Sequence, residues 1–376
     1  MTAGCYVHIP FCVRKCAYCD FNSFAGYTGE SVARYVRALE TEIRQTGPGG
    51  PAVDTIFFGG GTPTAIPAVD EARLLHAVLE SLPVTAGAEI TTEANPGTAD
   101  TSNLAVLREA GFNRISLGVQ SFDAGLLKTL DRIHSADEAK HAVRAARDAG
   151  FDNVSIDLMF ALPRQTMSQW NATLDQSFAL ETDHISLYSL IVEEGTGFHT
   201  LYQKGRLPLP DDDVAAEMYQ TAIDRAADAG FEQYEISNFA RPGRRCRHNI
   251  HYWRNDPYYG FGCGAVAYRD GQRRMNVKSP ARYADAALSN GNLAESVETL
   301  RADEAMAETM MLGLRLTEEG VDSARFASRF GCDPRDRYAG EIARFQGLGL
   351  LEPAGDNLRL TQKGVFLASE VMMAFV

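Results

Sequence analysis

Three cysteines lie close together near the N-terminus. Cys12, Cys16 and Cys19 follow the spacing C-x3-C-x2-C. Cysteine thiolates are the usual ligands of iron–sulfur clusters. A cubane takes one thiolate per iron, so three cysteines would leave one iron open to a ligand that is not protein. Structural zinc is the alternative, but zinc prefers four protein ligands, often in paired C-x2-C units, and no second pair follows at such a distance. The spacing therefore favours a metal cluster over zinc.

A glycine run follows the next apolar segment. Phe57-Phe58 leads into Gly59-Gly60-Gly61-Thr62-Pro63. Glycines let a ligand approach the main chain without a Cβ clash. A phosphate loop is the alternative, but no Gly-Lys-Ser/Thr follows. By itself the glycine run is a weak indication of a ligand site. Because it follows the cysteines by one predicted strand, the two together are a strong indication.

The chain alternates β-rich runs with amphipathic helical patterns. Strands are predicted at residues 5–9, 55–58, 89–93 and 184–188, and helices at 31–45, 70–82 and 136–149. Three helical patterns end at a glycine and a phenylalanine before a β-rich run, which indicates repeated α/β units. This order predicts an α/β fold with a parallel sheet, open or closed into a barrel. Polar residues fall at the carboxyl ends of the strands, where such folds place their sites: Glu93, Gln120 and Asp157.

The rhythm changes after about Ser237. Residues 238–300 are rich in Gly, Tyr, Arg and Asn and are predicted to form an irregular connector between a barrel domain, 1–237, and a C-terminal domain, 301–376. In the last domain, helical patterns precede a hairpin near 350–360 and a closing helix over 363–375. This order is typical of a winged-helix-like module.

Charge and hydropathy limit the partners. There are 36 Lys and Arg against 49 Asp and Glu among 376 residues, a formal charge of −13, which argues against a nucleic acid partner. No apolar run is long enough for an integral membrane segment, and no targeting signal stands at the N-terminus, so a cytoplasmic location is predicted.

Residues 12–19 resemble the signature of the radical S-adenosylmethionine (SAM) superfamily, and Tyr18 before the third cysteine fits that pattern. The glycine run resembles the motif that contacts the methionine amine of SAM. The resemblance implies a partial (β/α)6 TIM-like barrel and a [4Fe–4S] cluster. It also implies that SAM chelates the open iron and is cleaved by one electron to methionine and a 5′-deoxyadenosyl radical.

The sequence also resembles the coproporphyrinogen oxidase-like subgroup along nearly the whole chain, in the blocks 6–12, 93–96, 116–122 and 156–163. Matching positions imply that Tyr6, Gly60 and Glu93 contact the cluster-bound SAM. They also imply contacts to a second SAM from Tyr18, Gly61, Thr62, Gln120, Arg132 and Asp157. Helix capping or an internal barrel network is the alternative role for the acids and the glutamine.

Two departures favour the heme chaperones of this subgroup over its oxidases. The oxidases carry a further cysteine two residues after the third, where this chain has Phe21. They also have a long N-terminal extension, whereas here the first strand is expected by about Cys5. In addition, residues 248–253 match the H-N-x-x-Y-W signature of the chaperones.

The same region could contact heme. Residues 241–256 carry five arginines against one acid, and Arg244 and Arg245 could pair with propionates. His248 or His251 could supply an axial imidazole. A packed loop with solvated arginines is the alternative, and zinc held by Cys246, Cys263 and these histidines is a weaker one.

Three functions therefore compete. The first is a heme chaperone that passes heme to acceptor hemoproteins, respiratory ones among them. The second is an oxygen-independent coproporphyrinogen III oxidase, and the third is another radical SAM enzyme, for example one that modifies RNA. Phe21 and the 248–253 block favour the first over the second, and the negative charge disfavours the third.

Overall fold

The computed structural model describes residues 2–376, and its centre is a run of parallel strands. Six strands pair in chain order: β1 (Ala3–Ile9), β2 (Val53–Gly60), β3 (Val84–Ala94), β4 (Arg114–Gln120), β5 (Asn153–Phe160) and β6 (His184–Ser189). They are buried on both faces for most of their length, as strands covered on both sides must be. The strands predicted from the sequence lie within β1, β2, β3 and β6.

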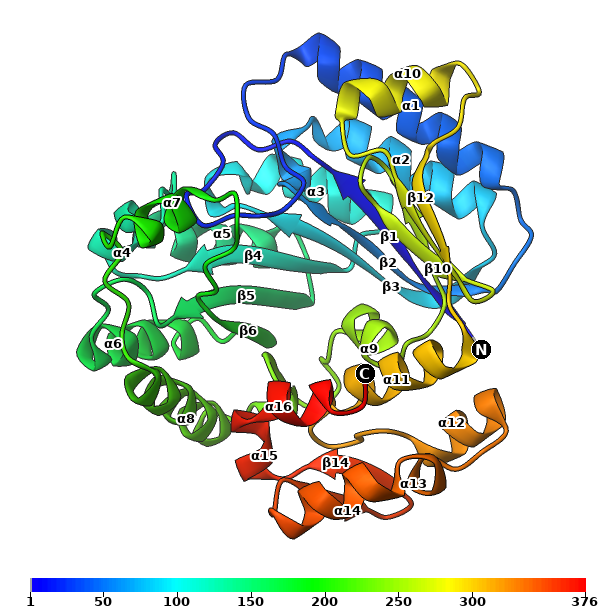
Figure 1. Cartoon of the computed structure of the whole chain (residues 1–376). Helices are drawn as coiled ribbons and strands as arrows, with labels where there is room; N and C mark the ends of the chain where they lie inside the picture. The colour runs from blue at the N-terminus through cyan, green and yellow to red at the C-terminus, as the bar shows by residue number, and fades with distance from the viewer. Residues whose placement is uncertain (1) are drawn as a thin grey trace.

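Helices connect these strands and cover the outer face of the sheet (Figure 1). They are α1 (Gly29–Thr46), α2 (Ala68–Ser81), α3 (Thr101–Ala110), α4 (Ala124–Thr129), α5 (Ala136–Asp148) and α6 (Met167–Phe178), with short 3-10 turns at Pro63–Ala65 and Pro96–Thr98. Capping boxes at Thr28, Ser135 and Thr166 begin α1, α5 and α6. Gly111 ends α3 with a φ of 119°, which only glycine adopts freely. Repeated strand and helix units thus build the expected partial (β/α)6 barrel.

After β6, two helices and a pair of antiparallel strands complete one edge of the sheet. These elements are α7 (Gly197–Gln203), α8 (Asp212–Asp228), β7 (Glu232–Glu235) and β8 (Asn238–Ala240). No helix within residues 2–376 has the length and hydropathy to cross a membrane.

The connector predicted to be irregular at 238–300 is in fact regular. It contains β8, α9 (Arg247–Trp253), β9 (Tyr258–Phe261), β10 (Val266–Arg269), β11 (Gln272–Asn276), α10 (Pro280–Leu288) and β12 (Ala294–Thr299). β9 pairs in parallel with β1, and β10 to β12 continue the sheet, which has twelve strands within the described residues. The expectation failed because these strands are short, and because β9 takes its place in the sheet by pairing with β1, which is distant in the sequence.

The C-terminal segment has its own hydrophobic core. Its elements are α11 (Ala302–Gly313), α12 (Ser323–Phe330), α13 (Pro334–Arg337), α14 (Ala339–Gly347), the hairpin β13 (Leu351–Ala354) and β14 (Asn357–Leu360), α15 (Gln362–Phe366) and α16 (Ala368–Met373). Met310, Phe326, Phe345 and Val371 meet in one buried cluster. Helices followed by a hairpin agree with the winged-helix-like expectation, although the closing helix is interrupted at Leu367, whose backbone leaves the helical region.

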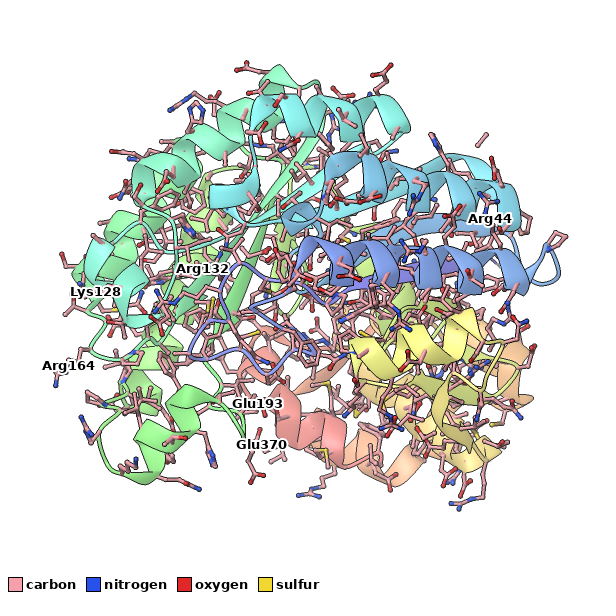
Figure 2. All side chains as sticks on the ribbon, turned by 90° about the horizontal axis from the view of Figure 1, so that it is seen from above. Arg44, Lys128, Arg132, Arg164, Glu193 and Glu370 are labelled. Carbon is pink, nitrogen blue, oxygen red and sulfur yellow. The ribbon has the colours of Figure 1, made fainter. Side chains whose placement is uncertain are left out.

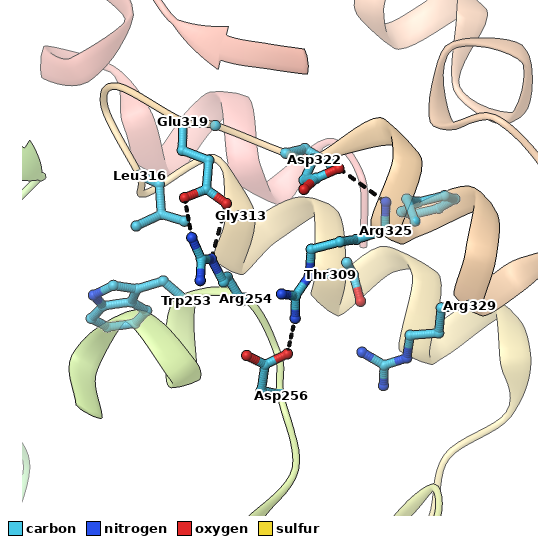
Figure 3. A pocket seen from close by; sticks show the side chains of 13 residues that line it. Trp253, Arg254, Asp256, Thr309, Gly313, Leu316, Glu319, Asp322, Arg325 and Arg329 are labelled. Atoms are coloured by element: carbon cyan, nitrogen blue, oxygen red, sulfur yellow. Dashed lines mark hydrogen bonds and ion pairs between the residues drawn. The ribbon is translucent and has the colours of Figure 1, made fainter. Parts of the chain in front are cut away.

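Ion pairs join this domain to the segment around α9. Arg254 donates two hydrogen bonds to Glu319, and Arg325 pairs with Asp256, as Figure 3 shows. α9 itself lies against the inner side of the barrel, at the amino ends of β1 and β2 (Figure 1). It therefore closes the end of the barrel opposite to the cysteines.

Candidate cofactor site at the carboxyl ends of the strands

The three cysteines lie in the loop that follows β1. Two backbone hydrogen bonds hold the loop closed, one from Cys12 N to Phe24 O (3.0 Å) and one from Phe24 N to Pro10 O (2.7 Å). Cys12 is buried, whereas Cys16 and Cys19 are partly exposed. All three line one cavity.

The glycine run is fastened to the start of this loop. Gly61 N donates to Ile9 O and Thr62 N to Phe11 O, both at 2.8 Å. A Cβ on Gly61 would lie 2.7 Å from Phe11 O, so a side chain there would force the two segments apart. Gly60 has a φ of 114°, and a Cβ on it would lie 2.3 Å from the His8 ring. Gly61 is thus needed for the close approach of β2 to the cysteine loop, and Gly60 for its approach to the His8 ring on β1.

Two carboxylates face the cavity from β3 and β5, the strands on either side of β4. Glu93 ends β3 and accepts a hydrogen bond from Gly60 N at 3.2 Å. Burial, together with the nearby charge of Asp157, raises the pKa of Glu93 to about 7. Asp157 accepts from the Ser116 hydroxyl at 3.1 Å, and burial raises its pKa as well.

Gln120 and Arg132 line the same cavity. Gln120 ends β4 with a φ of 65°, an uncommon conformation for a residue other than glycine. The Arg132 guanidinium donates to Gly118 O and contacts the Cys16 sulfur at 3.4 Å. Seen from above, Arg132 lies beside the blue loop that carries the cysteines (Figure 2).

The structure thus brings most of the sequence-predicted site residues to one cavity. Its lining includes Cys12, Cys16, Tyr18, Cys19, Gly60, Gly61, Thr62, Glu93, Gln120, Arg132 and Asp157. The spacing suits a cluster that takes one thiolate per iron. Within residues 2–376, no three His, Cys, Asp or Glu side chains come close enough to share a single metal ion, as a zinc site would require.

Tyr6 faces an adjoining cavity. Phe21, Gly60 and Glu93 line both this cavity and the cavity of the cysteines. The other walls of the adjoining cavity include Tyr6, His8, Tyr252, Tyr258 and residues 264–266. Sequence reasoning missed His8 as a site residue. Its Nε2 donates to Asn22 O, which leaves Nδ1 to accept from the Tyr6 hydroxyl, both at 2.9 Å. The sequence could have indicated His8, because it lies two residues after Tyr6 in a predicted strand and residues at that spacing share one face.

The expected heme contacts do not gather at either cavity. His248 is buried at 1% exposure, and both of its ring nitrogens are bonded, Nδ1 to the Thr55 hydroxyl (2.9 Å) and Nε2 to the Tyr252 hydroxyl (3.0 Å). His251 lies between Asp54 and Asp256, at 2.7 and 3.0 Å. In this conformation neither imidazole is open to a heme iron. Both instead fix α9 in the barrel.

The two arginines predicted to meet heme propionates lie near acidic side chains that are distant in the sequence. Arg245 pairs with Glu232 and Glu318, and Arg244 lies 3.8 Å from Asp183. A charge count along the chain could not reveal these partners, and contact of Arg244 and Arg245 with heme propionates stays a prediction. The zinc alternative fails, because Cys246 contacts Glu89 at the barrel end whereas Cys263 lies beside Asn22 of the cysteine loop.

We expect His248→Leu to lower the free energy of unfolding by about 2–4 kcal/mol, because the buried Thr55 and Tyr252 hydroxyls would lose their partner. Burial lowers the pKa of His248 to about 3. The unfolded chain therefore takes up the proton first, and this histidine makes stability fall as the pH drops from about 6.5 towards 3. Denaturant titrations at pH 5 and pH 7.5 measure both effects.

His141→Leu is the matched control, since His141 is exposed on α5. It should change stability by less than about 0.5 kcal/mol. A His248→Leu protein as stable as wild type would contradict the structural role of His248.

Comparison with known proteins agrees with this geometry. Residues 6–176 match the radical SAM superfamily, and residues 300–367 match the HemN C-terminal domain. The heme chaperone HemW of Bacillus subtilis is 38% identical over 99% of this chain and 98% of its own length. The Escherichia coli protein of the same name is 35% identical over 99% and 97%. Among solved structures, the coproporphyrinogen III oxidase HemN of Escherichia coli matches with a TM-score of 0.85 at 24% identity, covering 100% of this chain and 90% of that one, which shows the shared fold.

Proposed function

Since the chain belongs to the radical SAM superfamily and, within it, to the family of the heme chaperone HemW, we propose that it is a heme chaperone that carries a [4Fe–4S] cluster and SAM. One observation carries the cofactor assignment. Three cysteines from the loop after β1, two close-approach glycines at the end of β2 and two partly buried carboxylates from β3 and β5 surround a single cavity.

Cys12, Cys16 and Cys19 would each hold one iron, and the fourth iron would take SAM. Bound there, the cluster and SAM supply one-electron cleavage chemistry. The protein residues do the positioning: Gly60 and Gly61 keep the main chain close, and Glu93 presents a carboxylate to the polar groups of SAM. A second SAM in contact with Tyr18, Gly61, Thr62, Gln120, Arg132 and Asp157 stays a prediction.

Heme transfer rests on the relatives' name and on the adjoining cavity. That cavity has aromatic side chains from Tyr6, Phe21, Tyr252 and Tyr258, and a small apolar wall at residues 264–266. Such a lining suits a planar apolar macrocycle. Phe21, 61% exposed, stands at its mouth, at the position where the oxidases carry a further cysteine. We therefore place the heme next to the cluster. Acceptor hemoproteins and a cytoplasmic location remain predictions.

The test gives the cluster-reconstituted protein heme and coproporphyrinogen III in separate assays. We expect a Soret band that saturates near one equivalent of heme per chain. With SAM and dithionite, we expect coproporphyrinogen III to stay unconverted. Vinyl-bearing product formed over many turnovers would establish the oxidase instead.

Two variants locate the heme. Val266→Trp should fill part of the adjoining cavity and weaken heme binding about tenfold or more. Replacing Arg244 and Arg245 together by alanine should leave binding within about twofold, because these side chains already have acidic neighbours. If the double arginine variant weakens heme binding and Val266→Trp does not, the heme binds near α9 instead.

A further inference from the structure

Arg132 reaches the cysteine loop from the segment between α4 and α5. Its Nη1 lies 3.4 Å from the Cys16 sulfur, and its Nη2 donates to Gly118 O on β4. The Nε atom is buried and has no partner. The guanidinium is therefore fixed by the end of β4 and directed at a thiol that the proposed cluster would use.

Hydroxyl groups lie near the sulfurs of the other two cysteines. The Thr62 hydroxyl donates to the Cys12 sulfur at 3.6 Å, and the Ser23 hydroxyl lies 3.9 Å from the Cys19 sulfur. Ser23 is buried, and Thr62 lies where β2 meets the cysteine loop. Cys12 and Cys19 thus lie near hydroxyl groups, Cys16 lies near both Tyr18 and Arg132, and Arg132 is the one charged group among these partners.

We propose that Arg132 sets the reduction potential of the cluster through Cys16, with a smaller contribution from Thr62 through Cys12. This inference rests on the proposed cluster. One-electron reduction takes the cluster from the 2+ to the 1+ state and adds a negative charge that spreads onto the sulfurs. A fixed cation and hydrogen bonds to the sulfurs stabilise the reduced state, so they raise the potential.

The other cations of the loop, Arg14 and Lys15, donate their hydrogen bonds to oxygen atoms and not to the cysteine sulfurs. Arg14 is mostly exposed and pairs with Asp131 at 2.6 Å. The Lys15 ammonium donates to the backbone oxygens of Phe21 and Ser23. Water screens the Arg14 charge, whereas the contact of Arg132 with Cys16 is direct. Arg132 should therefore dominate.

The resemblance to the subgroup gives Arg132 a different partner, a second SAM. The two roles differ in what happens without SAM. A SAM contact alone changes the response of the cluster to SAM and leaves the potential of the SAM-free cluster unchanged. Tuning through Cys16 changes the potential of the SAM-free cluster.

The experiment is a redox titration of the reconstituted, SAM-free protein, with dithionite as the electron donor and the paramagnetic signal of the reduced cluster as the readout. In Arg132→Met we expect the ratio of reduced to oxidised cluster at a fixed potential to fall about tenfold. For a one-electron couple this is a shift of about 59 mV to lower potential. Thr62→Val should shift the ratio about threefold in the same direction.

Arg14→Met is the matched control, because it removes a nearby charge that touches no sulfur, and it should change the ratio less than twofold. Arg132→Lys keeps the charge and should recover most of the effect. Iron and sulfide content, measured first, shows whether each protein carries the cluster. If the wild-type chain takes up no cluster, the proposed function itself is contradicted, together with this inference.

Equal potentials for wild type and Arg132→Met at full cluster content would overturn the proposal. If Arg132→Met takes up no cluster, Thr62→Val decides the question in its place. An unchanged potential in Thr62→Val at full cluster content would then overturn the proposal.

Discussion

Alanine at any one of Cys12, Cys16 or Cys19 should remove nearly all of the iron–sulfur cluster after anaerobic reconstitution. Each thiolate is expected to hold a different iron, and the described cavity contains no fourth cysteine that could replace a lost one. Iron and acid-labile sulfide per chain should fall close to zero, together with the brown absorbance. We expect the folded chain to remain, since the loop is also held by backbone hydrogen bonds.

Cys263→Ala is the most demanding control. Cys263 lies beside the cysteine loop, because Asn22 donates to its backbone oxygen at 3.1 Å. Burial raises the pKa of the Cys263 thiol to about 12, so it stays protonated and is a poor metal ligand. Alanine there, or at Cys332, should leave iron content unchanged. Equal loss of iron in Cys263→Ala, or one zinc per chain in wild type, would contradict the assignment.

The cysteine loop and the barrel could be predicted from the sequence because their signals are local. The spacing of the cysteines, the glycine run and the polar residues at strand ends each fall within a few positions. A parallel sheet then places the carboxyl ends of its strands side by side, so that Glu93 and Asp157 share a cavity. Topology converts local patterns into a site.

The region around α9 could not be predicted, because its order depends on distant partners. The Glu89 carboxylate, on β3, accepts hydrogen bonds from the first two amides of α9, Arg247 N and His248 N, both at 3.1 Å. These two hydrogen bonds explain why a helix begins at Arg247 although the residue before it, Cys246, is not a capping residue. Histidines and arginines that look like free ligands along the chain become structural once these partners are known.

Glu93→Gln should weaken SAM binding about 100-fold, roughly 2.7 kcal/mol. The ionised carboxylate at the end of β3 is the group expected to meet the polar and cationic groups of SAM, and a buried ionic contact is strengthened by the low dielectric. Equilibrium dialysis with labelled SAM, and the change of the reduced-cluster spectrum at saturating SAM, measure the loss. Glu80→Gln, on the exposed side of α2, should bind as wild type does.

The pH dependence gives this prediction a sign. With its pKa at about 7, Glu93 is mostly neutral at pH 6 and mostly ionised at pH 8 in the ligand-free protein. If SAM requires the ionised form, affinity in wild type should rise with pH up to about 7 and then level off, by at most tenfold per unit. The glutamine variant cannot ionise, so the part of the pH dependence due to this group should vanish.

Stability separates this effect from damage to the fold. A carboxyl group whose pKa is higher in the folded chain than the usual 4.5 lowers stability as the pH rises from 4.5 through about 7, because the folded state resists losing the proton. Glu93→Gln removes that penalty and can still accept the Gly60 hydrogen bond, so at pH 8 the variant should unfold at no lower denaturant concentration than wild type. A variant that binds SAM within threefold of wild type would contradict the role of Glu93. A variant that loses SAM while keeping or gaining stability would show that the fold tolerates a buried carboxylate here for the sake of the ligand.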